Sequence, residues 1–137
     1  HAPYTPFPPS TLRMNDYVQW ARQNSVSCKH QQRLGARGDG GKWMCVGRMP
    51  LAGEPCLVLS VGSGHDFSWE SAVHAQWPHC SIHVFDGTNF GRGVPRNVPG
   101  FVRFHAQNFG SRPTREIERV IAGATRVHVL KIDVRLR

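Results

Sequence analysis

The chain has 137 residues, with 17 lysines and arginines against 9 aspartates and glutamates, so its formal net charge is +8. This length suits one domain with its own core and is short for two. Hydrophobic residues make up 39% of the sequence, which excludes a wholly disordered chain. No apolar run approaches the roughly 18–20 residues that a membrane-spanning helix needs. The positive charge favours anionic partners, and nucleic acid is the first class to consider.

The first part of the chain predicts a lead-in and a helix. Residues 1–9 (HAPYTPFPP) hold four prolines and are expected to be extended. Ser10 or Thr11 would cap a helix that fades near Asn24. Four side chains repeat along it with helical spacing: Met14, Tyr17, Val18 and Ala21. Residues 35–41 (GARGDGG) predict a loop, because neither helices nor strands tolerate so much glycine. We therefore separate residues 1–27 from an α/β domain at 28–137.

Strands and helices alternate from residue 57 onward. Residues 57–61 form an almost wholly apolar run, as in a strand covered on both faces, and three further strands are predicted at 82–85, 101–104 and 127–132. One helix is expected from Ser68, as its cap, to Pro78, with Trp69, Ala72, Val73, Gln76 and Trp77 on one face. Another should start at Ser111 or Thr114, carry Ile117, Val120 and Ile121, and end at Gly123. This order predicts an α/β fold with a mostly parallel sheet and flanking helices.

Ligands of such sheets bind beyond the carboxyl ends of the strands. Gly62-Ser63-Gly64 follows the first strand, where glycines let the backbone approach a ligand closely. Asp86 ends the second strand, where a carboxylate can accept hydrogen bonds from two ribose hydroxyls. Position 67 is Phe67, so the full dinucleotide-binding glycine pattern is absent, which favours a nucleoside without pyrophosphate. The alternatives are a plain glycine turn and an aspartate that caps the loop before Gly87.

Five segments together resemble a known family: GDGGKWMC (38–45), CLVLSVGSGHDFSWE (56–70), CSIHVFDGT (80–88), FVRFH (101–105) and VLKIDV (129–134). They are similar to methyltransferase-like proteins, which are S-adenosylmethionine-dependent class I methyltransferases with a Rossmann-like fold, related to the sugar O-methylating FkbM type. The resemblance covers roughly residues 28–134. It implies methyl transfer from S-adenosylmethionine, with oxygen of a sugar or another small acceptor receiving the methyl group.

The resemblance also implies roles for particular residues. Those matching the cofactor site are Gly62, Ser63, Gly64, Asp66, Glu70 and Asp86, of which Asp86 would hold the ribose. Asp133 matches the acid beside the transferred methyl group and is the candidate catalytic residue. A hydroxyl acceptor also needs a general base, for which His65, His105 and Asp133 are nearest in sequence. Asp39 and Lys42 either close over the cofactor or pair with each other on the surface.

The sequence departs from the family pattern after the last strand. The family continues K-I-D-V/I-E-G, whereas here a basic stretch, residues 135–137, follows Val134. The chain also begins at His1, not at methionine. We therefore expect a processed chain or a fragment, incomplete at its C-terminus, or a diverged protein that keeps cofactor binding without catalysis. Activity of this chain alone is in question, and the last strand should expose apolar surface.

The four cysteines predict disulfides. Cys56 and Cys80 precede strands that should be neighbours, about 4.8 Å apart, so these two cysteines are expected within disulfide range. Cys28 and Cys45 would form a second pair, and the alternative is four free thiols. Disulfides would indicate a secretory or extracellular location, and free thiols a cytoplasmic one. Two Cys–His pairs could hold zinc, but the paired CxxC signature is absent and no metal is expected.

Two other functions remain open at this point. One is a cofactor-binding domain without catalysis, and the other is a basic module that binds nucleic acid. The arginines of the second half are spread over predicted loops and a helix: Arg92, Arg96, Arg103, Arg112, Arg115 and Arg119. Since no nucleic-acid-binding motif accompanies them, they are interpreted as solvated surface, and no specific nucleic acid partner is expected. The expected partner is a small-molecule or glycan acceptor.

Overall fold

A computed structural model of the chain describes residues 28–87, 93–107, 115–124 and 126–133. The elements in chain order are β1 (Gln31–Leu34), β2 (Lys42–Cys45), β3 (Leu57–Val61), α2 (Ser68–Gln76), β4 (Ser81–Phe85), β5 (Val102–His105), α3 (Arg115–Ala122) and β6 (Val129–Ile132). The predicted lead-in and helix of residues 1–27 lie outside the described residues. Within the described part of the chain, every helix is too short or too polar to span a membrane.

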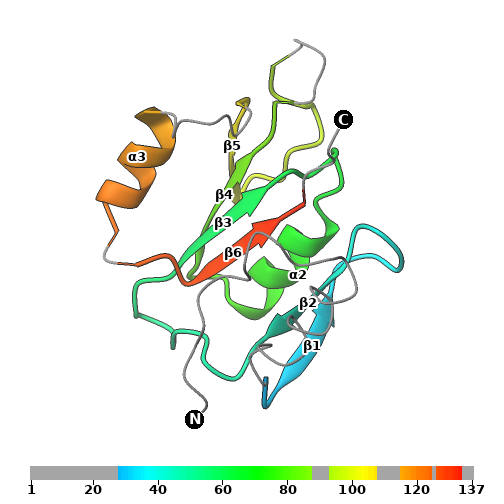
Figure 1. Cartoon of the computed structure of the whole chain (residues 1–137), viewed down its shortest axis with the longest axis vertical. Helices are drawn as coiled ribbons and strands as arrows, with labels where there is room; N and C mark the ends of the chain where they lie inside the picture. The colour runs from blue at the N-terminus through cyan, green and yellow to red at the C-terminus, as the bar shows by residue number, and fades with distance from the viewer. Residues whose placement is uncertain (1–27, 88–92, 108–114, 125, 134–137) are drawn as a thin grey trace, which may run out of the picture.

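Four parallel strands form the central sheet in the order β5-β4-β3-β6 (Figure 1). All five residues of β3 are buried, as the apolar sequence LVLSV requires of a central strand. From β3 the chain adds β4 and β5 on one side and then returns to add β6 on the other. The strand order therefore reverses between β3 and β6, which is where ligands of open α/β sheets bind. The predicted Rossmann-like α/β fold is confirmed.

The two faces of the sheet carry different helices because side chains alternate along each strand. On one face Val58 and Val84 pack in a core with Trp69 and Val73 of α2. On the other face Leu57, Leu59 and Phe85 form a second cluster with three partly buried residues of the α3 region: Val120, Ala124 and Val127.

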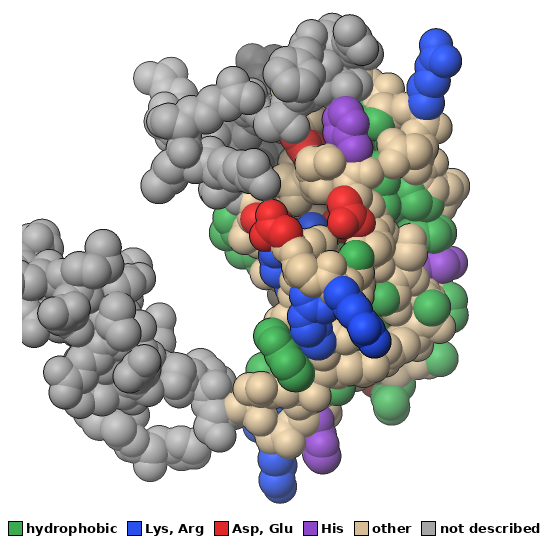
Figure 2. Space-filling model, turned by 90° about the vertical axis from the view of Figure 1, so that its right-hand side faces the viewer, with side chains coloured by type: hydrophobic (Ala, Val, Ile, Leu, Met, Phe, Trp, Pro, Cys, Tyr) green, Lys and Arg blue, Asp and Glu red, His purple; other side chains and the backbone are tan. Residues whose placement is uncertain are grey.

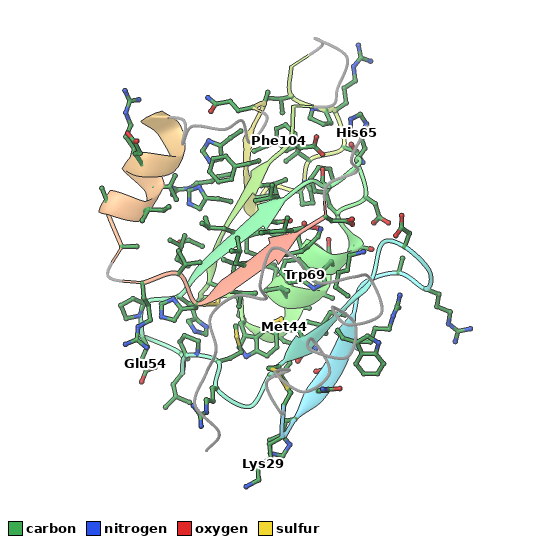
Figure 3. The ribbon with its side chains drawn as sticks, in the orientation of Figure 1. Lys29, Met44, Glu54, His65, Trp69 and Phe104 are labelled. Carbon is green, nitrogen blue, oxygen red and sulfur yellow. A yellow bond between two sulfur atoms is a disulfide. The ribbon has the colours of Figure 1, made fainter. Side chains whose placement is uncertain are left out.

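An antiparallel hairpin of β1 and β2, which the sequence analysis did not predict, packs on the α2 side. Its strands have only four residues each, and only Leu34 and Met44 among them are buried. Met44 lies beside Trp69 in the layer between the hairpin and α2 (Figure 3). The predicted glycine loop, residues 35–41, is the connection of this hairpin.

The predicted N-cap of α2 and the predicted start of the last strand were wrong. Ser68 is the first residue of α2 and Phe67 is the N-cap, because the Ser68 hydroxyl accepts a hydrogen bond from the Ala36 N–H instead of capping the helix. Gln76 is exposed, whereas Trp69 and Val73, which were predicted on the same helical face, are buried. β6 begins at Val129 rather than at residue 127, since the His128 ring nitrogen accepts the hydrogen bond donated by the Leu57 N–H.

Both predicted disulfides are present. Cys56 and Cys80 lie at the amino ends of β3 and β4 with their Cα atoms 4.5 Å apart, as the parallel pairing of these strands predicted. Cys28 and Cys45 form the second bridge, with a Cα separation of 5.6 Å. His79 lies close to the Cys56–Cys80 bridge. Disulfide sulfurs are not thiolates, so the cysteines are not available as zinc ligands in this oxidised state.

Candidate functional site

The loop that follows β3 approaches the end of β6 very closely. Gly62 has φ +80°, and a Cβ atom on it would lie 2.0 Å from the Asp133 carbonyl oxygen. Gly64 and His65 also have positive φ, at +54° and +65°. Among the described residues, a Cβ on Gly64 would have no atom within 4 Å, so the described part of the chain leaves space beside this part of the loop. The loop thus needs glycine at Gly62 for close approach and presents its backbone to this space at Gly64.

Asp86, at the end of β4, holds this loop in place. Its Oδ2 accepts hydrogen bonds from the Ser63 N–H at 2.7 Å, the Ser63 hydroxyl at 3.0 Å and the Gly64 N–H at 2.9 Å. The residue is only 4% exposed. The glycine turn and the acid that the sequence analysis singled out are therefore in direct contact. In this structure one carboxylate oxygen is committed to the protein's own loop.

Asp66 is exposed at the end of the same loop, just before α2. Its Oδ1 accepts a hydrogen bond from the Ser68 N–H at 2.9 Å. Hydrogen bonds from the Ser68 side chain and backbone hold the pKa of Asp66 below its usual value, and Lys131 and Lys42 lower it further by their charge. Asp66 is therefore an anion at neutral pH at the rim of the loop.

Asp133 follows β6 and lies at the same edge of the sheet. Its N–H donates to the Val61 carbonyl at 2.8 Å, and its Oδ2 lies 3.0 Å from Nζ of Lys42. Lys42 Nζ also donates a 2.5 Å hydrogen bond to the Asp39 carbonyl. Figure 2 shows acidic and basic side chains gathered on the face of the molecule that carries the hairpin and the strand ends. Lys42 therefore pairs with the candidate catalytic acid as well as with Asp39.

Glu70 occupies a different place from the other predicted site residues. It is fully buried beneath β3, where Oε1 accepts hydrogen bonds from the Ser60 hydroxyl at 2.6 Å and from Lys131 Nζ at 3.1 Å. The Lys131 ammonium also lies 5.3 Å from the centre of the Trp69 ring. Glu70 thus ties α2 to β3 and β6 underneath the loop.

The candidate histidine bases lie apart from one another. His65 is exposed on the loop, and its carbonyl accepts a hydrogen bond from the Asn97 side chain at 2.9 Å. His105 ends β5, and its Nε2 lies 2.9 Å from Nδ1 of His83. His105 also stacks on Phe85, a member of the core cluster that packs against the α3 region. His105 is therefore engaged on the face of the sheet opposite α2.

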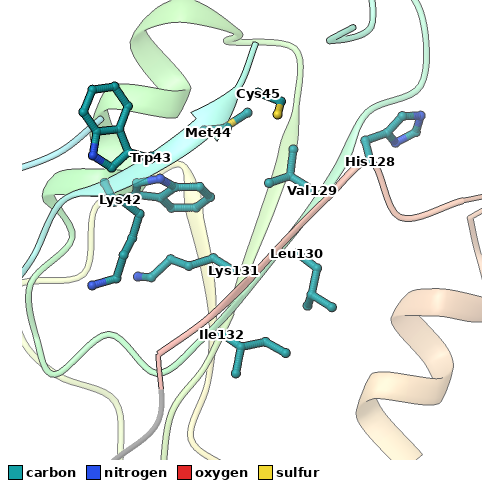
Figure 4. A pocket seen from close by; sticks show the side chains of 10 residues that line it. Lys42, Trp43, Met44, Cys45, His128, Val129, Leu130, Lys131 and Ile132 are labelled. Carbon is teal, nitrogen blue, oxygen red and sulfur yellow. The ribbon is translucent and has the colours of Figure 1, made fainter. Parts of the chain in front are cut away.

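A pocket of about 400 Å³ lies between β2 and β6 (Figure 4). Lys42 and Lys131 extend into it from the two strands. Three large apolar residues in its lining are exposed: Trp43 at 68%, Leu130 at 57% and Ile132 at 61%. The predicted exposure of apolar surface on β6 is confirmed for Leu130 and Ile132.

The structure brings most of the predicted site residues to one edge of the sheet. Gly62, Ser63, Gly64, Asp66, Asp86 and Asp133 lie there, whereas Glu70 is buried below them. Sequence reasoning did not predict that Lys42 pairs with Asp133. The GDGGKW motif was the sequence signal for this part of the site. Its position could not be predicted, because the hairpin that places it at the strand ends was not detected.

The sheet order defines an α/β protein of the Rossmann-like class, and its topological switch point is where ligands of such sheets bind in general. A family model described as a methyltransferase domain matches residues 6–135. The chain belongs to this methyltransferase-domain family. No curated protein and no solved structure matches the chain significantly.

Proposed function

We propose that the chain binds S-adenosylmethionine at the carboxyl edge of β3 and β4 and transfers its methyl group to an oxygen of a sugar or another small acceptor. Membership of the methyltransferase-domain family supports methyl transfer in general. The observation that carries the specific proposal is the contact between Asp86, at the end of β4, and the glycine turn after β3, the strand that borders the switch point of the sheet.

The residues at this edge fit a nucleoside ligand. The space beside Gly64 lets a ligand approach the backbone, and Asp86 lies next to it with a carboxylate suited to a ribose diol. Because Asp86 Oδ2 already accepts three hydrogen bonds from the loop, binding of ribose at this oxygen would require it to give up a loop contact. Binding and loop conformation are therefore expected to be coupled.

S-adenosylmethionine supplies a methyl group on a positively charged sulfur. The acceptor oxygen forms the new C–O bond, the electrons of the C–S bond stay on sulfur as a neutral thioether, and the hydroxyl proton must leave. Asp66, with its lowered pKa, supplies a negative charge that favours the cation. We assign the proton to the Asp133 carboxylate, which is half-exposed at the end of β6. Alignment of donor and acceptor supplies most of the remaining rate effect.

Glu70 contributes to this site from below in our proposal. Its hydrogen bonds to Ser60 and Lys131 fix the start of α2 against β3 and β6, and these strands lead into Gly62 and Asp133. Glu70 is therefore a positioning residue rather than a direct ligand of the cofactor.

A secretory or extracellular location is part of the same proposal. Two disulfides support it, because such bonds persist mainly in oxidising compartments.

Calorimetric titration of the full chain with S-adenosylhomocysteine tests the proposed site. The wild type should bind, and Asp86→Asn should weaken binding by about tenfold or more, since it removes the negative charge that the ribose hydroxyls contact. Glu118→Gln on the exposed surface of α3 is the matched control and should bind like the wild type. Ser63→Ala removes one hydrogen bond to Asp86 but keeps its charge, and should weaken binding less than Asp86→Asn.

Absence of binding to the wild type would contradict the proposal. Binding to single-stranded RNA that falls steeply with salt, without binding of S-adenosylhomocysteine, would favour the nucleic-acid alternative instead. Binding of the cofactor product without methyl transfer to any acceptor would favour the domain without catalysis.

A further inference from the structure

The loop between β1 and β2 carries a motif, GDGGKW (38–43), that the proposed cofactor contacts do not use. Arg33 stabilises this loop, because its guanidinium donates hydrogen bonds to the carbonyls of Ala36 at 2.8 Å and Gly38 at 2.5 Å. The Ala36 N–H donates to the Ser68 hydroxyl at 2.9 Å. The loop is therefore fastened to the first turn of α2, next to the candidate site.

The two consecutive glycines of the motif allow this close approach. A Cβ on Gly40 would lie 2.0 Å from Asp66 Oδ2, and a Cβ on Gly41 would lie 2.3 Å from the Ala36 carbonyl oxygen. A side chain at position 40 would collide with the Asp66 side chain, and one at position 41 would collide with the Ala36 carbonyl and the Arg33 guanidinium inside the loop. The glycines thus place the next residue, Lys42, beside the end of β6.

Lys42 and Asp133 form an ion pair, and further contacts within the protein fix the position of both residues. Lys42 Nζ lies 3.0 Å from Asp133 Oδ2 and also donates to the Asp39 carbonyl at 2.5 Å. The backbone of Asp133 is fixed by its hydrogen bond to Val61 and by its contact with Gly62. The two side chains are 30% and 39% exposed, so water screens their attraction only in part.

We propose that Lys42 is a positioning residue that holds the Asp133 carboxylate at the strand ends and offsets its negative charge. This inference rests on the proposed function. An unpaired carboxylate would bind the cationic sulfur of the donor more tightly than the neutral sulfur of the product. Such ground-state stabilisation is lost as the charge leaves sulfur, and therefore opposes the transfer. By pairing with Asp133, Lys42 limits this excess and fixes the position of the carboxylate.

The ratio of the affinities for S-adenosylmethionine and S-adenosylhomocysteine measures this effect without a known acceptor. The two ligands differ in the methyl group and in the charge on sulfur. Calorimetric titration of the full chain with each ligand should show that Lys42→Met shifts the ratio toward S-adenosylmethionine by about fivefold, because a nearby positive charge is lost. Lys42→Arg, which keeps the charge, should retain the wild-type ratio.

Two further variants make the result specific. Lys29→Met removes the same charge from an exposed position at the other end of the hairpin and should leave the ratio unchanged. In the Asp133→Asn background, Lys42→Met should shift the ratio less than it does in the wild-type background, since the carboxylate that Lys42 offsets is absent and only the direct effect of the lysine charge on the sulfur is left. Such non-additivity is the signature of a direct pair.

Each other outcome has a distinct meaning. If both ligands bind and Lys42→Met leaves their ratio unchanged, the inference is wrong and the proposed site stands. An equal loss of affinity for both ligands would show that Lys42 only supports the fold of the loop, and would also overturn the inference. If neither ligand binds the wild type, the proposed function fails and the inference fails with it.

Discussion

The hydroxyl of Ser60 and the carboxylate of Glu70 are joined by a 2.6 Å hydrogen bond in a region where neither residue is exposed. Lys131 completes this buried group from β6 at 3.1 Å. A buried carboxylate is costly unless it is paired and hydrogen-bonded; here Oε1 of Glu70 meets both conditions, whereas Oε2 has no hydrogen-bond partner among the described residues. The group joins β3, α2 and β6 directly below the loop of the candidate site.

Lys131→Met should strongly destabilise the protein. The change leaves Glu70 buried without its charged partner, and we expect the free energy of unfolding to fall by about 3–5 kcal/mol. Adding Glu70→Gln should recover more than half of this loss, because glutamine keeps an acceptor for Ser60 and carries no charge. Urea unfolding of the single and double variants measures both values. Equal stability of the two variants would show that the charge of Glu70 carries no such cost.

Gly62→Ala and Gly64→Ala should differ sharply although both residues have positive φ. At Gly64 the added methyl meets no atom of the described residues, so we expect the cost to be the backbone strain, about 1–2 kcal/mol. At Gly62 the methyl would also collide with the Asp133 carbonyl and displace the end of β6. We expect Gly62→Ala to be more destabilising by at least about 2 kcal/mol in the same urea assay. A smaller penalty at Gly62 than at Gly64 would mean that the Asp133 contact is not held in solution.

The sequence predicted the parallel sheet well because its signals are local and strong. The apolar run 57–61, the glycine turn and the helix before Pro78 each leave a clear pattern, and their order implies parallel strands. The hairpin escaped prediction because its strands are four residues long and only two of their side chains are buried. Its position depends on contacts with α2 from far along the chain, as in the hydrogen bond from Ala36 to Ser68.

The sequence predicted which residues make up the candidate site, but not which of them pair with one another. The residues at the strand ends could be placed from the topology alone, and Asp86 does contact the glycine turn. Whether Glu70 points toward the ligand or into the core is decided by the helical phase of α2, which the sequence pattern did not resolve. The pairing of Lys42 with Asp133 depends on the docked hairpin and so could not be predicted without it.

The Cys56–Cys80 disulfide should contribute about 3 kcal/mol to stability. It closes a loop between residues that are 24 apart in sequence, and by chain entropy such a cross-link destabilises the unfolded state by roughly that amount. The double variant Cys56→Ala, Cys80→Ala measures the effect in urea unfolding under non-reducing conditions. The corresponding pair of alanines at Cys28 and Cys45 is the comparison, since that bridge closes a shorter loop with a sequence separation of 17. Unchanged stability without Cys56–Cys80 would contradict the prediction.

Stability should fall between pH 7 and pH 4 because of His83. The side chain is 7% exposed, and burial lowers its pKa from 6.5 to about 4, with further contributions from His105 and Arg103. In the unfolded chain the ring takes up a proton near pH 6.5, whereas the folded protein resists protonation until about pH 4. The unfolded state therefore binds more protons in this window, and the folded state loses stability as the pH falls. Between pH 7.5 and pH 4.5, the wild type should lose about 1–2 kcal/mol more of its free energy of unfolding than His83→Gln does, after allowance for solvent screening.

The exposed His30→Gln variant is the control and should follow the wild type in urea unfolding at both pH values. Parallel pH profiles for His83→Gln and the wild type would show that His83 does not titrate differently in the two states.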